Sequence, residues 1–113
     1  MAECIFCKII SGEIPSTKVY EDDKVLAFGD LNPQAPVHVL IIPKKHIKSL
    51  DDVKQEDIEL LGHIQVVAGK LAKEHNLPDG YRVVNNCGID GGQTVAHLHY
   101  HLLGGRTFGW PPG

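Results

Sequence analysis

The sequence lacks the features that would assign it at once to several large classes of proteins. It has no excess of basic residues, since 11 Lys and Arg stand against 14 Asp and Glu for a net charge of −3, whereas nucleic-acid-binding proteins usually carry a basic face. Its longest apolar run, at residues 37–43, is interrupted by His38 and is far too short to span a bilayer. Residues 1–10 lack the basic region and the long apolar stretch of a secretion signal. We therefore expect no nucleic-acid partner, no membrane association and no export.

Cysteine is scarce, and its number is odd. Three cysteines in 113 residues do not make a disulfide framework, and unpaired thiols are typical of a reducing compartment, so we expect a cytoplasmic protein. The length and the ordinary apolar and charged fractions predict a single domain, residues 1–113, with no linker or internal repeat.

The apolar pattern predicts two helices and five strands. A short helix is expected at residues 4–11, where apolar residues recur at helical spacing and Gly12 follows as a stop signal. A long helix is expected from about residue 54 to 75, on a stripe that includes Leu60, Ile64, Val67 and Leu71. The expected strands are residues 18–20, 24–30, 37–42, 81–86 and 95–103.

The order of these elements predicts the fold class. Three strands, a helix and two more strands do not alternate regularly, which favours an α+β fold with an antiparallel sheet over a parallel α/β sheet. Because one long helix covers one face of such a sheet, an open face or edge remains, and this favours a dimer.

Three of the seven histidines fall at alternate positions, as His97, His99 and His101. In a strand this spacing places three imidazoles on one face, with Leu98, Tyr100 and Leu102 on the other. Imidazoles this close cannot all be protonated, so some are neutral near pH 7 and can act as nucleophile, base or metal ligand. A hydrolytic metal site usually adds carboxylates, and no Asp or Glu follows Thr94, which weakens a catalytic-metal interpretation without excluding it.

A glycine-rich stretch, residues 86–94, leads directly into this row. Glycines let backbone N–H groups approach an anion closely, so a phosphate held here would lie beside the histidines. The stretch is not a Walker loop, because no Gly-Lys-Ser/Thr follows and a strand comes next. By itself it would be a hairpin turn in most proteins.

The pair Cys4-x-x-Cys7 allows several interpretations. It supplies two thiols that can be redox-active, can bind zinc or can have no chemical role. A structural zinc needs four ligands, and histidines are available near the buried strand at residues 37–42, with His38 at its start and His46 after its end. The spacing alone does not decide among these readings.

Together these residues resemble the histidine triad (HIT) family, whose signature is His-x-His-x-His followed by two apolar residues. The signature stands here as HLHYHLL at residues 97–103. The resemblance covers nearly the whole chain. Within the family, the chain most resembles the Hint branch, in the bacterial type with an N-terminal Cys-x-x-Cys. The segments that carry it are CIFCKIISGEIP, PVHVLIIPKKHI, NNCGIDGGQTVAHLHYHLLGGR and the closing WPPG.

The resemblance implies a HIT-like fold: a five-stranded antiparallel sheet with one long and one short helix, joined into a ten-stranded sheet in a homodimer. It also implies binding of purine nucleotides and cleavage at the α-phosphate of AMP conjugates such as adenosine phosphoramidates and aminoacyl-adenylates. The bond cleaved is P–N or P–O, and the reaction passes through a nucleotidyl-histidine intermediate.

The same resemblance implies a role for particular residues. His99 is the nucleophile, His101 contacts the phosphate or leaving group and helps to transfer a proton, and His38 stands behind the triad. Asp30, followed by Leu31, binds the ribose, and Trp110 shapes the pocket of the partner subunit. The residues implied to hold the phosphate and its surroundings are Asn86, Gly92, Gln93 and Thr94.

Bacterial-type relatives also imply a structural zinc ion bound by two Cys and two His. The matching positions are Cys4, Cys7, His46 and His97. No catalytic metal is implied. Alternative functions are a zinc-stabilised nucleotide-binding interaction module with little turnover, a dinucleoside polyphosphate hydrolase, and a metal-dependent hydrolase that uses the histidine row.

Overall fold

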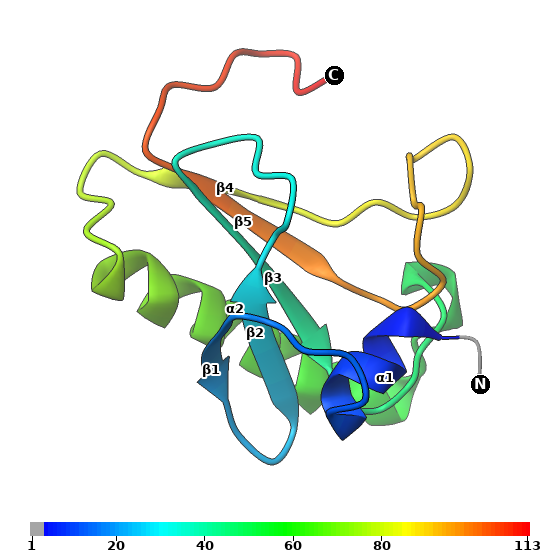
Figure 1. The fold of residues 1–113 in the computed structure, drawn as a ribbon. Helices are drawn as coiled ribbons and strands as arrows, with labels where there is room; N and C mark the ends of the chain where they lie inside the picture. Colours follow the sequence, from blue (N-terminus) through cyan, green and yellow to red (C-terminus); the bar gives the residue numbers. More distant parts are fainter. Residues whose placement is uncertain (1–3) are drawn as a thin grey trace.

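The structure is a computed structural model that describes residues 4–113 (Figure 1). Two α-helices, α1 (Ile5–Ser11) and α2 (Ile58–Glu74), accompany five strands. Two single turns of 3₁₀-helix, η1 (Leu50–Asp52) and η2 (Gln55–Asp57), precede α2. The strands are β1 (Lys18–Glu21), β2 (Val25–Gly29), β3 (Val37–Pro43), β4 (Tyr81–Val84) and β5 (Tyr100–Gly104).

The strands form one sheet in the order β1-β2-β3-β5-β4, and every neighbouring pair is antiparallel. The predicted α+β fold is therefore confirmed. β5 lies between β3 and β4, so the histidine-bearing segment enters the middle of the sheet, with Leu40 of β3 opposite His101. β4 forms one edge of the sheet.

The two faces of the sheet carry two separate apolar cores. α2 lies behind the sheet in Figure 1 and packs Ile64, Val67 and Leu71 against one face, as the predicted stripe requires. α1 lies in front, at one end of β2 and β3, and packs Phe6 and Ile9 against the other face. Gly12 ends α1 with φ of 88°, a left-handed conformation that glycine adopts without strain. Because α1 is short, it covers only part of its face, and the histidines lie beside it.

The predicted strand at residues 95–103 is wrong in its first half, since β5 begins only at Tyr100. The N–H of Leu98 donates to the carbonyl of Ile47 at 2.7 Å, a residue outside the strands. The expected alternation of side chains nevertheless holds. Leu98, Tyr100 and Leu102 all belong to the core beneath α2.

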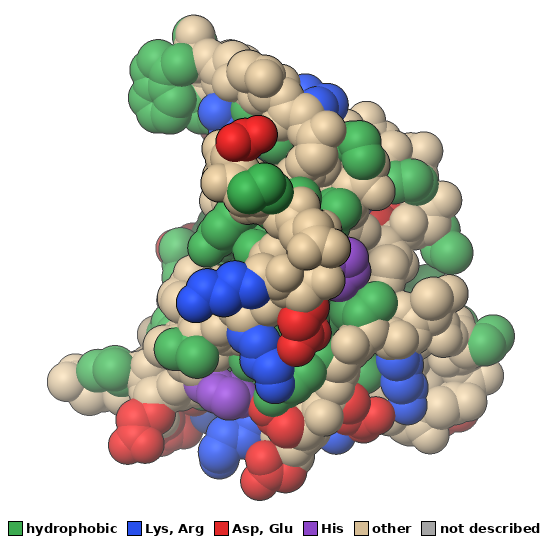
Figure 2. All heavy atoms as spheres, turned by 90° about the vertical axis from the view of Figure 1, so that its left-hand side faces the viewer, with side chains coloured by type: hydrophobic (Ala, Val, Ile, Leu, Met, Phe, Trp, Pro, Cys, Tyr) green, Lys and Arg blue, Asp and Glu red, His purple; other side chains and the backbone are tan. Residues whose placement is uncertain are grey.

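No helix in the described part of the chain is long and apolar enough to cross a membrane. Figure 2 shows acidic and basic side chains interspersed over the lower part of one side of the molecule. That side therefore carries no patch of a single charge sign.

Candidate functional site

A cavity of about 280 Å³ lies between α1, β2 and the histidine segment. His99, His101 and Thr94 line one part of it, and Asp30 and Leu31, at the end of β2, line another. The remaining walls are mostly apolar and come from α1, the segment after it, and β2 and β3. They include Phe6, Ile9, Ile14, Pro15, Phe28 and Leu40. We call this space the histidine cavity.

His99 is held in one tautomer by its own backbone neighbourhood. Its Nδ1 lies 2.7 Å from the carbonyl oxygen of His97, and a carbonyl only accepts, so Nδ1 carries the proton. Nε2 of a neutral ring therefore has a free lone pair. The edge of the ring meets Phe6 at right angles, with centroids 5.1 Å apart, and the side chain is buried. A buried imidazole that is oriented with a free lone pair on Nε2 is suited to nucleophilic attack.

His38 fixes the tautomer of His101 in a similar way. The backbone N–H of Gln34 donates to Nδ1 of His38 at 3.0 Å, so the proton of a neutral His38 is on Nε2. That Nε2 lies 2.9 Å from Nδ1 of His101 and 3.4 Å from the Asp30 carboxylate. His101 thus accepts at Nδ1 and keeps its own proton on Nε2, where it can donate to a ligand.

Burial and two neighbouring imidazoles, His99 and His38, lower the pKa of His101 to about 4. His101 is therefore neutral near pH 7, as its hydrogen bonds also require.

Asp30, His38 and His101 could in principle form a metal site, because their ligand atoms lie within 4.8 Å of one another. The hydrogen bond from Gln34 argues against it. With Nδ1 of His38 occupied as an acceptor, a metal on Nε2 would demand an imidazolate ring. These three residues form a proton-ordered hydrogen-bond chain instead, which weakens the metal-dependent hydrolase interpretation.

The glycine-rich loop is braced from inside by Gln93. Its side-chain oxygen accepts from the N–H of Gly88, and its amide donates to the carbonyls of Lys48 and Val95. Gly88 and Gly92 take positive φ values of 74° and 82°, which favour glycine. Gly91 has no room for a side chain, because a Cβ there would lie 2.3 Å from the Cys87 carbonyl oxygen.

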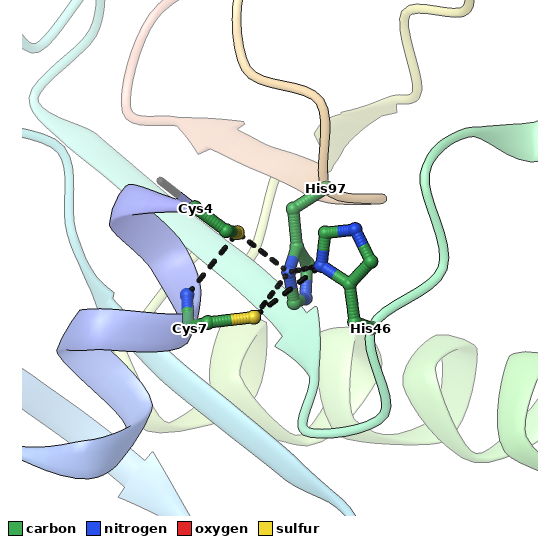
Figure 3. A group of neighbouring side chains, drawn as sticks. All are labelled: Cys4, Cys7, His46 and His97. Carbon is green, nitrogen blue, oxygen red and sulfur yellow. Dashed lines mark hydrogen bonds between the residues drawn. The ribbon is translucent and has the colours of Figure 1, made fainter. Parts of the chain in front are cut away.

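A second group of side chains lies at the first turn of α1 (Figure 3). The Sγ atoms of Cys4 and Cys7 and the Nδ1 atoms of His46 and His97 point toward one another and lie within 4.8 Å. The S–N separations are 3.3 to 3.7 Å and the N–N separation is 3.1 Å. A tetrahedral zinc ion places such atoms about 3.3 to 3.8 Å apart, so the residues fit this metal.

The surroundings of this group prepare its atoms as ligands. Nε2 of His97 donates to the Pro43 carbonyl at 2.9 Å, which leaves the lone pair on Nδ1. Burial lowers the pKa of His97 to about 4, so the ring stays neutral. The N–H of Cys7 donates to Sγ of Cys4, as it would to a thiolate. Burial raises the pKa of Cys7 to about 11, and a bound dication would reverse that effect.

The structure thus gathers most of the predicted site residues into two groups. His99, His101, Asp30, Leu31 and Thr94 line the histidine cavity, and His38 stands behind His101. Asn86, Gly92, Gln93 and Trp110 do not line it. Asn86 and Gly92 belong to the adjoining loop segment, Gln93 braces that loop, and Trp110 is 85% exposed.

Sequence reasoning missed Asn85, whose side chain donates to the carbonyl of His99 at 2.9 Å. Nothing in the sequence singles it out beside Asn86. Its role depends on how β4 and the histidine segment meet in space.

The chain is similar to known proteins over nearly its whole length. The family model described as "Scavenger mRNA decapping enzyme C-term binding" matches residues 3–107. A 14 kDa zinc-binding protein from Zea mays is 58% identical, over 96% of this chain and 87% of its own.

Two solved structures of histidine triad proteins are similar to this chain over nearly its whole length. A HIT family hydrolase from Legionella pneumophila is 56% identical with a TM-score of 0.97, covering 98% of this chain and 100% of its own. A histidine triad nucleotide-binding protein from Candida albicans is 43% identical with a TM-score of 0.79, covering 96% of this chain and 83% of its own.

Proposed function

The chain belongs to the histidine triad (HIT) family, and we propose that it is a nucleotide-binding hydrolase that acts on conjugates of AMP. It would cleave the P–N or P–O bond at the α-phosphate through a nucleotidyl-histidine intermediate on His99. The observation that carries this proposal is the hydrogen bond from Nδ1 of His99 to the His97 carbonyl, which leaves Nε2 as a free nucleophile.

The histidine cavity is suited to hold a nucleotide from end to end. Its apolar walls offer a surface for a purine base, and Asp30 can accept hydrogen bonds from the ribose hydroxyls. The phosphate would lie next to His99, His101 and Thr94, with Asn86 and the Gly92 region on its far side. We propose that Leu31 borders the ribose and that Trp110 completes the pocket of a partner subunit in a homodimer.

The reaction would proceed in two displacements. Nε2 of His99 gives its lone pair to phosphorus, the P–N bond breaks, and the leaving nitrogen takes a proton from solvent water to depart as an amine. The hydroxide left by that proton transfer then attacks phosphorus, which breaks the bond to Nε2, releases AMP and restores His99. Nε2–H of His101 donates to a phosphoryl oxygen as charge develops there. Of the two roles expected for His101, the hydrogen-bond chain favours this contact over proton transfer, because a proton passed from Nε2 of His38 to His101 would leave His38 as an imidazolate.

We further propose that Cys4, Cys7, His46 and His97 hold a structural zinc ion. The ion would join α1 to the segment before β5. It would take no part in the chemistry, because its ligands face α1 and none of the steps above needs a Lewis acid.

Turnover of adenosine 5′-monophosphoramidate by purified protein tests the function. His99→Ala should lower the rate of AMP release at least about a thousandfold, while AMP still binds. His63→Ala, a control on α2 away from the cavity, should retain the activity. Full activity of the His99 variant would overturn the proposal.

Other outcomes would point to the alternatives. Tight AMP binding without turnover of any conjugate would indicate a binding module. Faster cleavage of dinucleoside polyphosphates would indicate the other hydrolase type. Loss of the chemistry on chelation, with the fold retained, would indicate a catalytic metal.

A further inference from the structure

A second hollow lies beside the histidine cavity, and the two share a wall. It has a volume of about 470 Å³ and is lined by Cys4, Ile5, His46, Lys48, Thr94, Val95 and Ala96. Ile5, Thr94 and Val95 also line the histidine cavity. The two spaces are therefore adjacent, and Lys48 lines the second hollow but not the histidine cavity.

The charge of this second hollow differs from that of the histidine cavity. No Asp or Glu among the described residues lines it, and Lys48 is its one permanently charged side chain. Cys4 and His46 belong to the candidate zinc group, in which two thiolates would balance the charge of a dication. The described carboxylates leave Lys48 unpaired, whereas Lys18, Lys44 and Lys45 each form an ion pair.

Lys48 is also fixed relative to the loop. Its carbonyl accepts from the Gln93 side chain at 2.8 Å, and Gln93 in turn braces the loop that ends at Thr94. Before Lys48, the carbonyl of Ile47 accepts from Leu98, next to His99. The backbone of the lysine thus keeps its place beside both the loop and the nucleophile.

The direction of the substitution at phosphorus relates the histidine cavity to the second hollow. With the base among the apolar walls and the sugar at Asp30, the phosphate lies near Thr94, and the chain of substrate atoms continues past Thr94. In an in-line displacement the nucleophile and leaving group occupy opposite sides of phosphorus. Ammonia would need no further room as a leaving group, whereas a group the size of an amino acid would need a hollow such as this one.

We propose that the second hollow receives the leaving group, and that Lys48 selects leaving groups that carry a negative charge. This rests on the proposed function of His99. The preferred substrates are then AMP conjugates of amines that bear a carboxylate or a phosphate. The bonds made and broken are those given above, and Lys48 acts on binding and not on the proton.

The test uses adenosine 5′-phosphoramidates of three amines of similar size: β-alanine, propylamine and 1,3-diaminopropane. Each variant is compared with the unaltered protein on the same conjugate, which cancels the intrinsic reactivity of the amine. Lys48→Glu should lower kcat/KM for the β-alanine conjugate about fivefold to tenfold and raise it for the diaminopropane conjugate, since an exposed charge pair is worth up to roughly a fivefold change and the substitution replaces an attraction with a repulsion. The effect should shrink at high ionic strength.

Two controls separate this inference from the function on which it rests. Lys73→Glu, an equal charge change in the last turn of α2, should leave all three values within about twofold, and Lys48→Glu should leave cleavage of the unsubstituted phosphoramidate unchanged. If no conjugate is cleaved, the proposed function fails. If the unsubstituted compound is cleaved and Lys48→Glu changes the three conjugates equally or not at all, the inference about Lys48 is overturned alone.

Discussion

At the scale of single residues, the hydrogen-bond partners of each histidine determine what its ring can do. His97, His99 and His101 are identical side chains, yet Pro43, the His97 carbonyl and His38 respectively fix which nitrogen carries the proton. The outcome is one ring with a lone pair toward the cysteines, one with a free Nε2 and one with an Nε2–H. A row of equivalent residues thereby becomes a ligand, a nucleophile and a donor.

His38→Ala should lower kcat about twofold to tenfold with little change in KM. Without the Nε2–H of His38, the proton of His101 is no longer confined to Nε2, and the donor to the phosphoryl oxygen is lost part of the time. Steady-state kinetics on adenosine phosphoramidate measures both constants. His75→Ala, at the far end of α2, provides the matched control. A variant that changes only KM would show that His38 contributes to binding alone.

Gly91→Ala should weaken nucleotide binding more than it weakens the fold. A Cβ at this position would lie 2.3 Å from a backbone oxygen, so the loop must move. We expect Kd for AMP to rise at least about tenfold, measured by calorimetry. Gly109→Ala meets no atom within 4 Å and should bind as the unaltered protein does. Equal affinity of the two variants would show that the loop does not hold the phosphate.

At the scale of elements, α1 connects the two groups of the site. The same two turns carry Cys4 at the N-cap, Cys7 as a candidate ligand, and Phe6, whose ring contacts both His97 and His99. Phe6 also lines the histidine cavity. The position of α1 therefore affects the nucleophile and the base-binding wall together.

Removal of zinc should accordingly reduce stability and nucleotide affinity together. We expect one zinc per chain by elemental analysis, and none in Cys7→Ser. Chelation or this substitution should lower Tm by at least about 5 °C, because binding free energy available only to the folded state is lost. Cys87→Ser, outside the group, is the matched control. An unchanged Tm in Cys7→Ser would contradict a structural metal.

The elements also show what could be predicted from the sequence. The number and order of the strands and helices, and the alternation at residues 97–102, follow from local apolar periodicity, and the structure confirms them. The late start of β5 at Tyr100 could not be predicted, because it depends on Ile47, about 50 residues away, as the partner of Leu98. The hydrogen bonds of Asn85 to His99 and of Gln93 to Lys48 could not be predicted either, because they also join residues that are far apart in the sequence. Apolar periodicity indicates which face of a helix or strand a residue occupies. It does not indicate which distant backbone group the residue will hydrogen-bond.

At the scale of the whole molecule, buried neutral histidine makes the fold sensitive to acid. The pKa of His101 is lowered from about 6.5 in the unfolded chain to about 4 in the folded one. Between these values the unfolded state binds more protons, so stability falls as pH decreases from about 6.5 to 4, by at most about 1.4 kcal/mol per pH unit for this group.

Denaturant unfolding of the unaltered protein and of His101→Gln, at several pH values, measures this effect. In the variant, the free energy of unfolding should fall less steeply between pH 6.5 and 4 than in the unaltered protein. Below that range a second loss is expected in both proteins. His63 and two backbone N–H groups lower the pKa of Asp22 in the folded state, and that stabilisation disappears as Asp22 is protonated. Identical slopes in the two proteins would contradict the assignment to His101.

The outer edge of β4 and the adjacent side of α2 form the surface on which a homodimer would build a continuous sheet. β4 ends the sheet, and Tyr81 on it, 46% exposed, reaches Gly69 of α2. One helical turn before Gly69, Val66 is 69% exposed. An unpaired edge beside exposed apolar side chains favours association with another strand.

We therefore expect sedimentation equilibrium to give a molecular mass twice that of one chain. Val66→Glu should raise the dimer dissociation constant at least about tenfold, because it places a charge in an apolar contact. Ile89→Glu alters a residue that is 95% exposed on the glycine-rich loop, away from this surface, and should leave the dimer intact. Since Trp110 is expected to act in the partner's pocket, dissociation by Val66→Glu should also weaken binding of bulky conjugates. A monomer at micromolar concentration, or equal dissociation by both variants, would contradict this surface.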